Sequence, residues 1–219
     1  MTKVQANLQV DMHAEALSGL AAEVRYDHRR FPRRRGKVLA RAIGEAVIEE
    51  LAERGYNSLT FEGVASRAGT GKSTLYRRWA DKPSMVVDCL STAMPGVDDF
   101  DLTGDLRHDL TEVLASYAVS CAGTMGVALR VVCGEAVKCQ ELQRLWRERA
   151  AEPRLGAIRD MIQKAIDRGD ARPGATADEC VMVGPAMVGH LFMATDTPPT
   201  RAEVERIVDN VLIPMLRAR

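Results

Sequence analysis

Apolar residues recur with helical spacing along most of the chain. Between Val38 and Arg54 they form one stripe, made of Leu39, Ile43, Ala46, Val47 and Leu51. Gly55 follows as a helix stop. The same spacing returns over residues 105–122, 127–137, 141–150, 153–168, 177–194 and 201–216. The stretch from Leu129 to Cys133 also suits a buried strand, but the sequence offers no partner strands. The pattern therefore predicts an all-α fold.

Two short helical patterns separated by a glycine turn follow the first helix. One apolar face of the first pattern consists of Phe61, Val64, Ala65 and Ala68, with Thr60 ahead of it as an N-cap. Gly69 suits the left-handed turn that ends a helix. The second pattern begins at Gly71 and has Leu75 and Trp79 on one side, where Trp79 is expected in the core. This arrangement is typical of a helix-turn-helix, whose second helix enters the DNA major groove.

Several short motifs occur in a characteristic order around these helices. They are Arg54-Gly55-Tyr56, Leu59-Thr60, Val64 to Gly69, Thr74 to Trp79, and Lys82. In this order the segment from Val38 to Leu90 resembles the N-terminal domain of the TetR family of bacterial transcriptional repressors. The family's recognition helix usually opens on a serine cap, where this chain has Gly71, so Thr70 or Ser73 is an alternative cap. The resemblance implies a homodimer whose C-terminal domain binds a small, often apolar effector.

The donor-rich second helix supplies most of the predicted DNA contacts. We expect Lys72, Ser73 and Thr74 at its N-terminus to reach base edges, with Thr74 able to meet a thymine methyl group. Tyr76, Arg77 and Lys82 are expected at phosphates, a role that the resemblance supports for Tyr76 and Lys82. Arg78 suits bases, phosphates or solvent, and Gly71 permits close approach of the backbone. The full predicted set is Thr60, Gly71, Lys72, Ser73, Thr74, Tyr76, Arg77, Arg78, Lys82, Arg33, Arg34 and Arg35.

Charge is divided unevenly along the sequence. The net charge is zero, but residues 25–82 carry 14 Lys/Arg against seven Asp/Glu, and residues 91–219 carry 15 against 19. Six of the nine residues 29–37 are basic, including Arg33, Arg34 and Arg35. This run is either a solvated tail or an arm that follows phosphates or enters the minor groove. We expect a flexible basic extension over 1–35, a helix-turn-helix domain over 36–82, and a larger helical bundle over 83–219 for effector binding and dimerisation.

The last two predicted helices suggest a dimer interface. Residues 177–194 are apolar on nearly all sides, and Gly184, Ala186 and Gly189 allow another helix to approach closely. The last helix has a broad apolar stripe of Val204, Ile207, Val208, Val211, Leu212 and Met215. These patterns predict a homodimer through the last two helices, with an ordinary intrachain core as the alternative.

Candidate pocket residues are less sharply indicated. Methionines adapt to irregular cavities, and large side chains with polar tips can orient a ligand. The candidate ligand-binding set is Met125, Leu129, Trp146, Met161, Met187 and His190; the alternative for each is a plain core or interface role. We therefore predict a repressor that a small, apolar effector releases from a near-palindromic double-stranded DNA operator.

Two other interpretations stay open. The run Gly69 to Thr74 resembles the end of a phosphate-binding P-loop, but Ser66 stands where the first glycine belongs, and the preceding residues have helical rather than strand spacing. A thiol redox sensor is the second alternative. The five cysteines (Cys89, Cys121, Cys133, Cys139 and Cys180) show no C-x-x-C spacing and suit free, mostly buried thiols.

Other functional classes find no support in the sequence. No Ser/His/Asp set, carboxylate pair or metal-spaced histidine cluster stands out, so we expect no enzymatic activity, cofactor or metal. Residues 1–20 lack the apolar core of a signal peptide, and no apolar run reaches the ~20 residues of a membrane span. We expect a bacterial cytoplasmic protein, associated with the nucleoid when bound to DNA, with no membrane partner.

Overall fold

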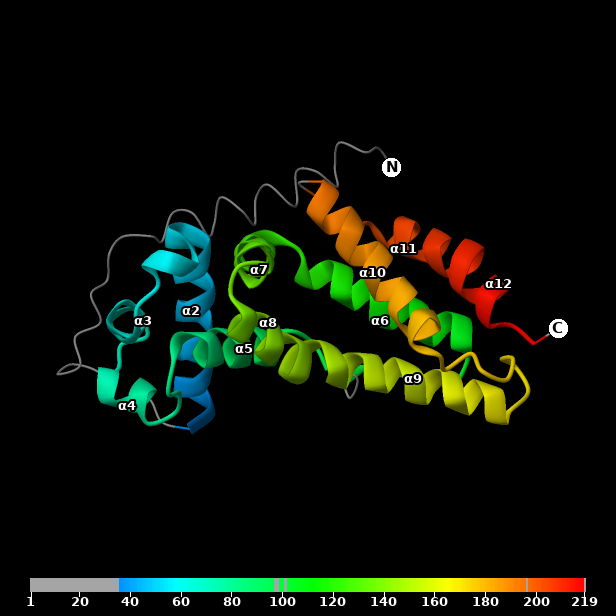
Figure 1. Cartoon of the computed structure of the whole chain (residues 1–219), viewed down its shortest axis with the longest axis horizontal. Coiled ribbons are helices and arrows are strands. Elements are labelled where there is room, and N and C mark those ends of the chain that lie inside the picture. Colours follow the sequence, from blue (N-terminus) through cyan, green and yellow to red (C-terminus); the bar gives the residue numbers. More distant parts are fainter. Residues whose placement is uncertain (1–35, 97–98, 101, 196, 219) are drawn as a thin grey trace, which may run out of the picture. The chain divides into compact units, whose positions relative to one another are not determined.

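The computed structural model describes residues 36–96, 99–100, 102–195 and 197–218, and it is built from helices (Figure 1). No named strand occurs within these residues, and a single antiparallel bridge joins Ala171 to Arg217. The predicted all-α class is confirmed. The helices are α2 Gly36–Ser58, α3 Phe61–Arg67, α4 Lys72–Tyr76, α5 Lys82–Ala93, α6 Leu106–Ser120, α7 Gly123–Ala136, α8 Gln140–Trp146, α9 Glu152–Asp167, α10 Asp178–Ala194, α11 Arg201–Ile207 and α12 Ile213–Leu216.

Local signals set several of these helix ends. Gly55 has φ 76° and ψ 170°, which breaks the regular part of α2 at the predicted stop. Thr60 caps α3 by accepting a hydrogen bond from the Gly63 amide, as predicted. Asp81 caps α5 in the same way through the Ser84 amide at 2.8 Å. Polar side chains thus fix where α3 and α5 begin.

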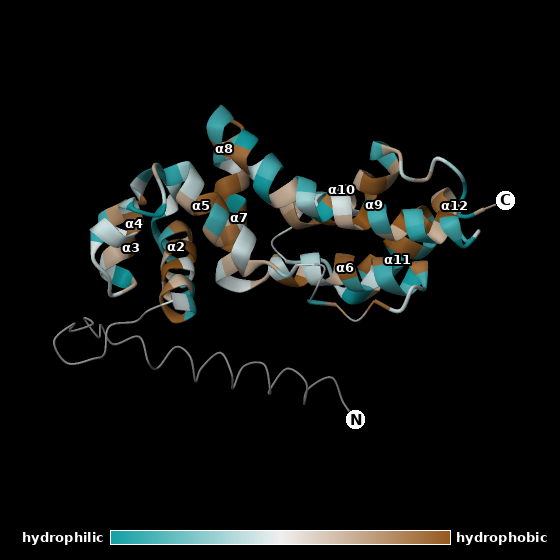
Figure 2. Ribbon diagram, turned by 90° about the horizontal axis from the view of Figure 1, so that it is seen from below, coloured by the Kyte–Doolittle hydropathy of each residue, from teal (hydrophilic) through white to brown (hydrophobic). Residues whose placement is uncertain are grey.

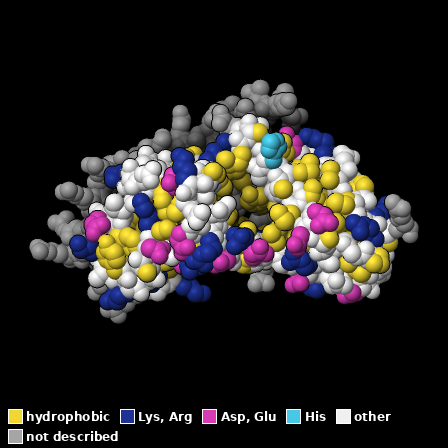
Figure 3. Space-filling view, viewed as in Figure 1, with side chains coloured by type: hydrophobic (Ala, Val, Ile, Leu, Met, Phe, Trp, Pro, Cys, Tyr) yellow, Lys and Arg dark blue, Asp and Glu magenta, His cyan; other side chains and the backbone are white. Residues whose placement is uncertain are grey.

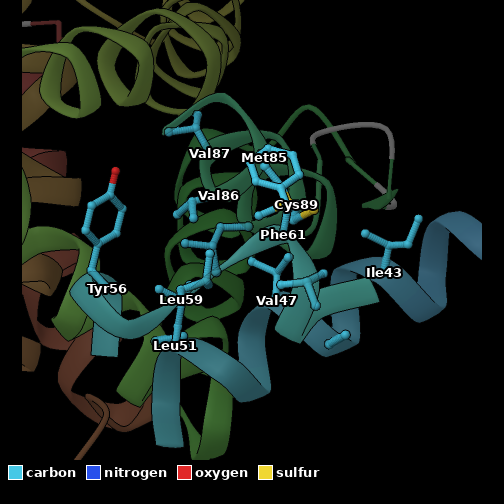
Figure 4. Packing of buried hydrophobic residues seen from close by; sticks show 14 of the residues in the cluster. Ile43, Val47, Leu51, Tyr56, Leu59, Phe61, Met85, Val86, Val87 and Cys89 are labelled. Atoms are coloured by element: carbon cyan, nitrogen blue, oxygen red, sulfur yellow. The ribbon is translucent and has the colours of Figure 1, made fainter. Parts of the chain in front are cut away.

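One hydrophobic core joins the N-terminal helices to α7 and α8. Side chains of α2, α3, α4 and α5 pack together with Leu59 from the link between α2 and α3; Val47 and Phe61 are among them (Figure 4). Ala128 and Val132 of α7, and Leu142 and Leu145 of α8, belong to the same cluster. Trp79 is partly buried against this core, as expected, and its Nε1 donates to Asp88 Oδ2 at 3.0 Å. The helix-turn-helix therefore shares a core with the next part of the chain.

A second core lies between α6, α9, α10 and the last helices. Along α6, α9, α11 and α12, hydrophobic and hydrophilic residues are interspersed with the spacing of amphipathic helices (Figure 2). Gly184 of α10 sits where a Cβ atom would lie 3.0 Å from Leu114 and 3.1 Å from Leu212. This confirms that a small residue at position 184 permits close helix packing, and the helices that approach belong to the same chain.

Two segments of π-helix lie inside longer continuous helices. The segment Arg147–Ala151 joins α8 to α9, and Val208–Leu212 joins α11 to α12. Each ends two residues before a proline, Pro153 or Pro214. A proline has no N–H for the carbonyl four residues earlier, and the shifted π hydrogen bonds let the helix continue past it. The two helices expected over 141–150 and 153–168 are therefore one.

The last helix uses much of its apolar stripe inside its own chain. Val204, Ile207, Val208 and Leu212 are buried in the second core, whereas Val211 and Met215 are only partly buried. On α10, Met182 and Met193 are each half exposed. The apolar surface of α10 and the last helices that could contact a second copy of the chain is thus smaller than the sequence suggested.

Across the described residues no single helix is long and apolar enough to cross a membrane. Only α6 and α7 taken together meet that length and composition, across an 86° bend.

Candidate nucleic-acid interface and effector cavity

The second helix of the helix-turn-helix, α4, is five residues long and begins after Gly71. Gly71 is the N-cap with φ −79° and ψ 140°, and no side chain caps the helix. Neither Thr70 nor Ser73 takes that role. Lys72, Ser73, Arg77 and Arg78 are exposed, so a row of donors faces outward. Thr60 is exposed as well, but its hydroxyl is engaged as the cap of α3.

Tyr76 is held in place while it remains half exposed. Its ring stacks on Phe61 of α3 with centroids 4.5 Å apart and planes at 6°. Phe61 is itself buried, so the tyrosine rests on the core of the two helices. This contact orients the phenol at the surface beside the exposed donors of α4.

An arginine with three glutamates locks α3 onto α2. Arg67 Nε lies 2.9 Å from Glu50 Oε1, its Nη1 lies 3.1 Å from Glu49 Oε2, and Glu53 accepts from both terminal nitrogens. These bonds raise the pKa of Arg67, and hydrogen bonding to Arg67 lowers the pKa of Glu53. The network fixes the helix that precedes the recognition turn.

A separate hydrophobic cavity lies between α6, α9 and α10. Its volume is about 290 Å³, near the lower end of ligand pockets. Figure 3 shows hydrophobic side chains around a hollow in the middle of one face of the molecule. The lining comes from Met94, Pro95, Gly96, Phe100, Val113, Leu114, Ser116, Tyr117, Ser120, Trp146, Ala150, Ala151, Arg154, Leu155, Ile158, Met182, Pro185 and Ala186.

Comparison with known proteins decides the family. Residues 43–89 match the family described as "Bacterial regulatory proteins, tetR family", and residues 100–211 match "Tetracyclin repressor-like, C-terminal domain". An uncharacterised HTH-type transcriptional regulator of Mycobacterium tuberculosis is 30% identical over 166 residues, which cover 76% of this chain and 82% of that protein. The chain belongs to the TetR family. It is accordingly a DNA-binding transcriptional regulator.

Two further relatives of this TetR-family chain cover most of its length. The DNA-binding transcriptional repressor TetR of Mycobacteroides abscessus is 26% identical, with coverage of 84% of this chain and 96% of that protein. The crystal structure of the TetR family transcription regulator SCO0332 superposes with a TM-score of 0.63 at 29% identity, covering 81% and 97%. The similarity therefore extends through the C-terminal helices.

Thr74 does not lie where the sequence placed it. The side chain was expected to reach base edges, but Thr74 is only 7% exposed. The adjacent Leu75 is fully buried, so the inner side of this short helix includes both residues. In the TetR-family helix-turn-helix seen here, Lys72 and Ser73 are the exposed candidates for base contacts.

Lys82 is engaged within the protein. Its Nζ donates to the carbonyl oxygens of Tyr56 at 3.0 Å and Asn57 at 3.3 Å. It also lies 4.7 Å from the centre of the Tyr56 ring. Lys82 thus ties the start of α5 to the end of α2. Arg33, Arg34 and Arg35 lie outside the described residues.

Most of the predicted pocket residues lie elsewhere. Of the six, only Trp146 lines the hydrophobic cavity. Met125 and Leu129 pack in a small cluster with Phe192, Met187 packs on the second core, and Met161 lines a different, more polar hollow. His190 is exposed on α10. The structure thus brings only Trp146 of the six to this cavity, because spacing along one helix does not show which face meets a space enclosed by several helices.

Two polar residues of the cavity were missed. Tyr117 lies in the helix predicted over residues 105–122, and burial raises the pKa of its phenol to about 12. Arg154 is half buried, and burial lowers the pKa of its guanidinium. The apolar stripe of residues 105–122 was a usable signal for Tyr117, whereas nothing in the sequence around Arg154 marked it as a cavity residue.

The alternatives considered from the sequence gain no support. The residues before Gly69 form helix α3, not the strand that precedes a P-loop. Burial raises the pKa of Cys89 to about 12 and that of Cys121 to about 11, so both thiols are less reactive than exposed ones.

Proposed function

We propose that this TetR-family regulator is a homodimeric repressor that an effector in the hydrophobic cavity releases from a near-palindromic DNA operator. The observation that carries the DNA part is the exposed donor row of α4, held beside a tyrosine that stacks on Phe61. The cavity between α6, α9 and α10 carries the effector part.

The exposure of each side chain decides which role we propose for it at the DNA. Lys72 and Ser73, exposed at the start of α4, are proposed at base edges in the major groove. Tyr76, Arg77 and Arg78 are proposed at phosphates, where contacts fix position rather than sequence. Thr60, Thr74 and Lys82 are proposed to stabilise the module rather than to bind DNA, and Gly71 leaves space for a close approach of the backbone. Two copies would read half-sites about 34–36 Å apart, or a multiple of that.

Selection of random double-stranded DNA by the purified protein tests this proposal. An inverted repeat with a steep salt dependence supports it. Arg77→Ala should weaken binding similarly on all sequences and reduce the salt slope by about 1. Ser73→Ala should instead change which bases are preferred. Arg147→Ala removes an exposed arginine on the segment before α9 and serves as the control, with no effect on either quantity. The absence of any enriched sequence would overturn the proposal.

The dimer is proposed through α10 and the last helices. Met193 is half exposed on α10, and a glutamate there would place a charge in the interface. Met193→Glu should convert the dimer to a monomer in sedimentation equilibrium. Val137→Glu is the matched control, because Val137 is 84% exposed at the C-cap of α7 and belongs to neither α10 nor the last helices. An unchanged dimer in the Met193 variant would place the interface elsewhere.

A further inference from the structure

Arg154 fastens the cavity wall to the end of α5. Its Nη2 donates to the carbonyl of Ser91 at 2.9 Å and to that of Met94 at 3.4 Å. Its Nη1 donates to the carbonyl of Ala150 at 2.8 Å and to Ser91 Oγ at 3.3 Å. The carbonyls of Ser91 and Met94 belong to the C-terminal end of α5, where helical partners run out. One guanidinium therefore holds two helices together beside the cavity.

The charge of Arg154 has no carboxylate beside it within the described part of the chain. Other arginines of the C-terminal helices are paired, for example Arg107 with Asp209 at 2.7 Å and Arg159 with Asp178 at 2.7 Å. Arg172 also binds backbone carbonyls, but it does not line the hydrophobic cavity. Carbonyl groups satisfy N–H donors without cancelling the charge, and a half-buried charge without a counter-charge is unfavourable. Arg154 is thus the cavity cation that an anion would stabilise.

The cavity offers further hydrogen-bonding capacity next to this cation. Arg154 has five N–H donors, and its Nε–H meets no acceptor among the residues that the structure describes. Tyr117 of α6 also lines the cavity, and its hydroxyl makes no hydrogen bond to any described residue. The remaining lining is mostly apolar, with Phe100, Leu155 and Met182 among it.

We propose that the cavity binds an amphipathic organic anion, with a carboxylate or similar head at Arg154 and Tyr117 and an apolar body against the surrounding side chains. This inference rests on the proposed function, because it names the chemical class of the effector in the same cavity. A guanidinium is suited to a planar anion through paired N–H bonds, and bonds between charged groups are stronger than those to neutral carbonyls. The anion competes with the α5 carbonyls for Arg154.

A chain of contacts connects Arg154 to the end of α4. Ser91 Oγ donates to the carbonyl of Arg149 at 3.1 Å, an oxygen that lacks its helical N–H because Pro153 lies four residues later. Arg149 Nη1 lies 3.0 Å from Asp88 Oδ1, and Asp88 accepts from Trp79, just beyond α4. An anion that draws Arg154 from the α5 carbonyls therefore acts on α5, whose Asp88 binds Trp79 just beyond α4. It changes DNA affinity only if it binds the two arrangements of α5 with different affinity.

Three probes of equal chain length test the head group: octanoate, 1-octanol and octylamine. Their binding to the full-length protein is measured by titration calorimetry. Octanoate should bind about tenfold or more tightly than 1-octanol, and octylamine should bind least. Arg154→Gln should abolish the preference for octanoate, Arg154→Lys should retain part of it, and Arg147→Gln should leave it unchanged. The comparison of probes on the unaltered protein stands even if Arg154→Gln fails to fold.

The outcomes separate this inference from the proposed function. If octanoate and 1-octanol bind equally tightly, the cavity remains a proposed effector site, but the proposal that it prefers a ligand with an anionic head group is wrong. Binding of none of the three probes overturns the assignment of this ligand class to this cavity. Neither result affects the operator selection, which needs no ligand. A preference for octanoate that persists in both Arg154 variants also overturns the inference.

Discussion

At the scale of single residues, Glu50 is the most constrained charge in the DNA-binding part. It is 3% exposed, and its Oε2 has no hydrogen-bond partner among the residues that the structure describes. Arg67, through Nε, binds the other oxygen, and Arg54 lies 3.7 Å from Oε2. The position of α3 thus depends on one guanidinium that balances a buried carboxylate.

Removal of that guanidinium should destabilise the protein strongly. Arg67→Ala leaves Glu50 buried with only the distant Arg54, and the expected loss of unfolding free energy is on the order of 3 kcal/mol. Glu53→Gln removes an exposed partner of the same arginine and should cost at most about 1 kcal/mol. Urea denaturation measures both. Equal losses would show that the buried glutamate is not what makes the network sensitive.

A serine at position 71 should raise the stability of the protein and lower its affinity for DNA. Gly71→Ser supplies the cap that α4 lacks, its backbone angles suit a side chain, and the only neighbour of an added Cβ is Ser73 Oγ at 3.8 Å. The expected gain in stability is a few tenths of a kcal/mol. If the backbone at Gly71 approaches DNA closely, operator affinity should fall in the same variant. Thermal melting and a binding titration check the two effects, and unchanged affinity would contradict the close approach.

Sequence patterns indicated which side chains of the helix-turn-helix are exposed better than they indicated which side chains line the cavity. The exposed donors of α4 follow from a single helix, whose outer side is clear from where Leu75 lies. Thr74 was misplaced because a helix of five residues has too little periodicity to show which neighbours of Leu75 share its burial. The cavity combines side chains from α6, the continuous helix α8 to α9, α10 and the residues after α5, and periodicity within one helix does not show which residues of different helices meet.

At the scale of helices, the order and most boundaries followed from apolar spacing, caps and glycines. The continuous helix from α8 to α9 did not. Pro153 suggested a break, because proline cannot donate to the preceding turn. The π segment changes the hydrogen-bond register just ahead of it, and such a change leaves no trace in hydrophobic periodicity.

The junction of α6 and α7 depends on one glycine. A Cβ on Gly126 would lie 1.9 Å from the Cys121 carbonyl oxygen, so Gly126→Ala requires the backbone to move. We expect a loss of about 3 kcal/mol or more in the free energy of unfolding. Gly134→Ala, on an exposed site of the same helix with no neighbour within 4 Å, should stabilise by up to about 1 kcal/mol. Chemical denaturation compares the pair, and a tolerated alanine at 126 would refute the close contact.

At the scale of the whole molecule, paired carboxylates set the acid limit of stability. Hydrogen bonds from Arg67, Ser84 and Arg107 lower the pKa values of Glu53, Asp81 and Asp209, respectively. A group whose pKa is lower in the folded state stabilises the fold at pH values above its unfolded-state pKa. This stabilisation is lost as the pH falls through the folded-state pKa. The melting temperature should therefore stay level down to about pH 5 and decline below about pH 4. A melting temperature that rises on acidification would contradict this.

Buried neutral groups set the limit at high pH. Burial raises the pKa values of Tyr117 and Cys89 to about 12 each, against ordinary values of 10.0 and 9.0. A group whose pKa is higher in the folded state stabilises the fold at pH values below its unfolded-state pKa. This stabilisation is lost as the pH rises toward the folded-state pKa. Stability should decline above about pH 9, measured by melting in buffers of equal ionic strength. A level profile to pH 12 would show that these groups ionise freely in the folded protein.

The shared core of α2 with α7 and α8 has a consequence for building hybrid regulators. An excised segment of residues 36–82 would carry the buried faces of Val47 and Leu51 without Ala128, Val132 and Leu142, which complete the cluster. Exposed apolar faces of that kind promote association and misfolding. A chimaera that borrows this operator specificity should therefore import α7 and α8 together with the DNA-reading helices, or replace the uncovered side chains with polar ones.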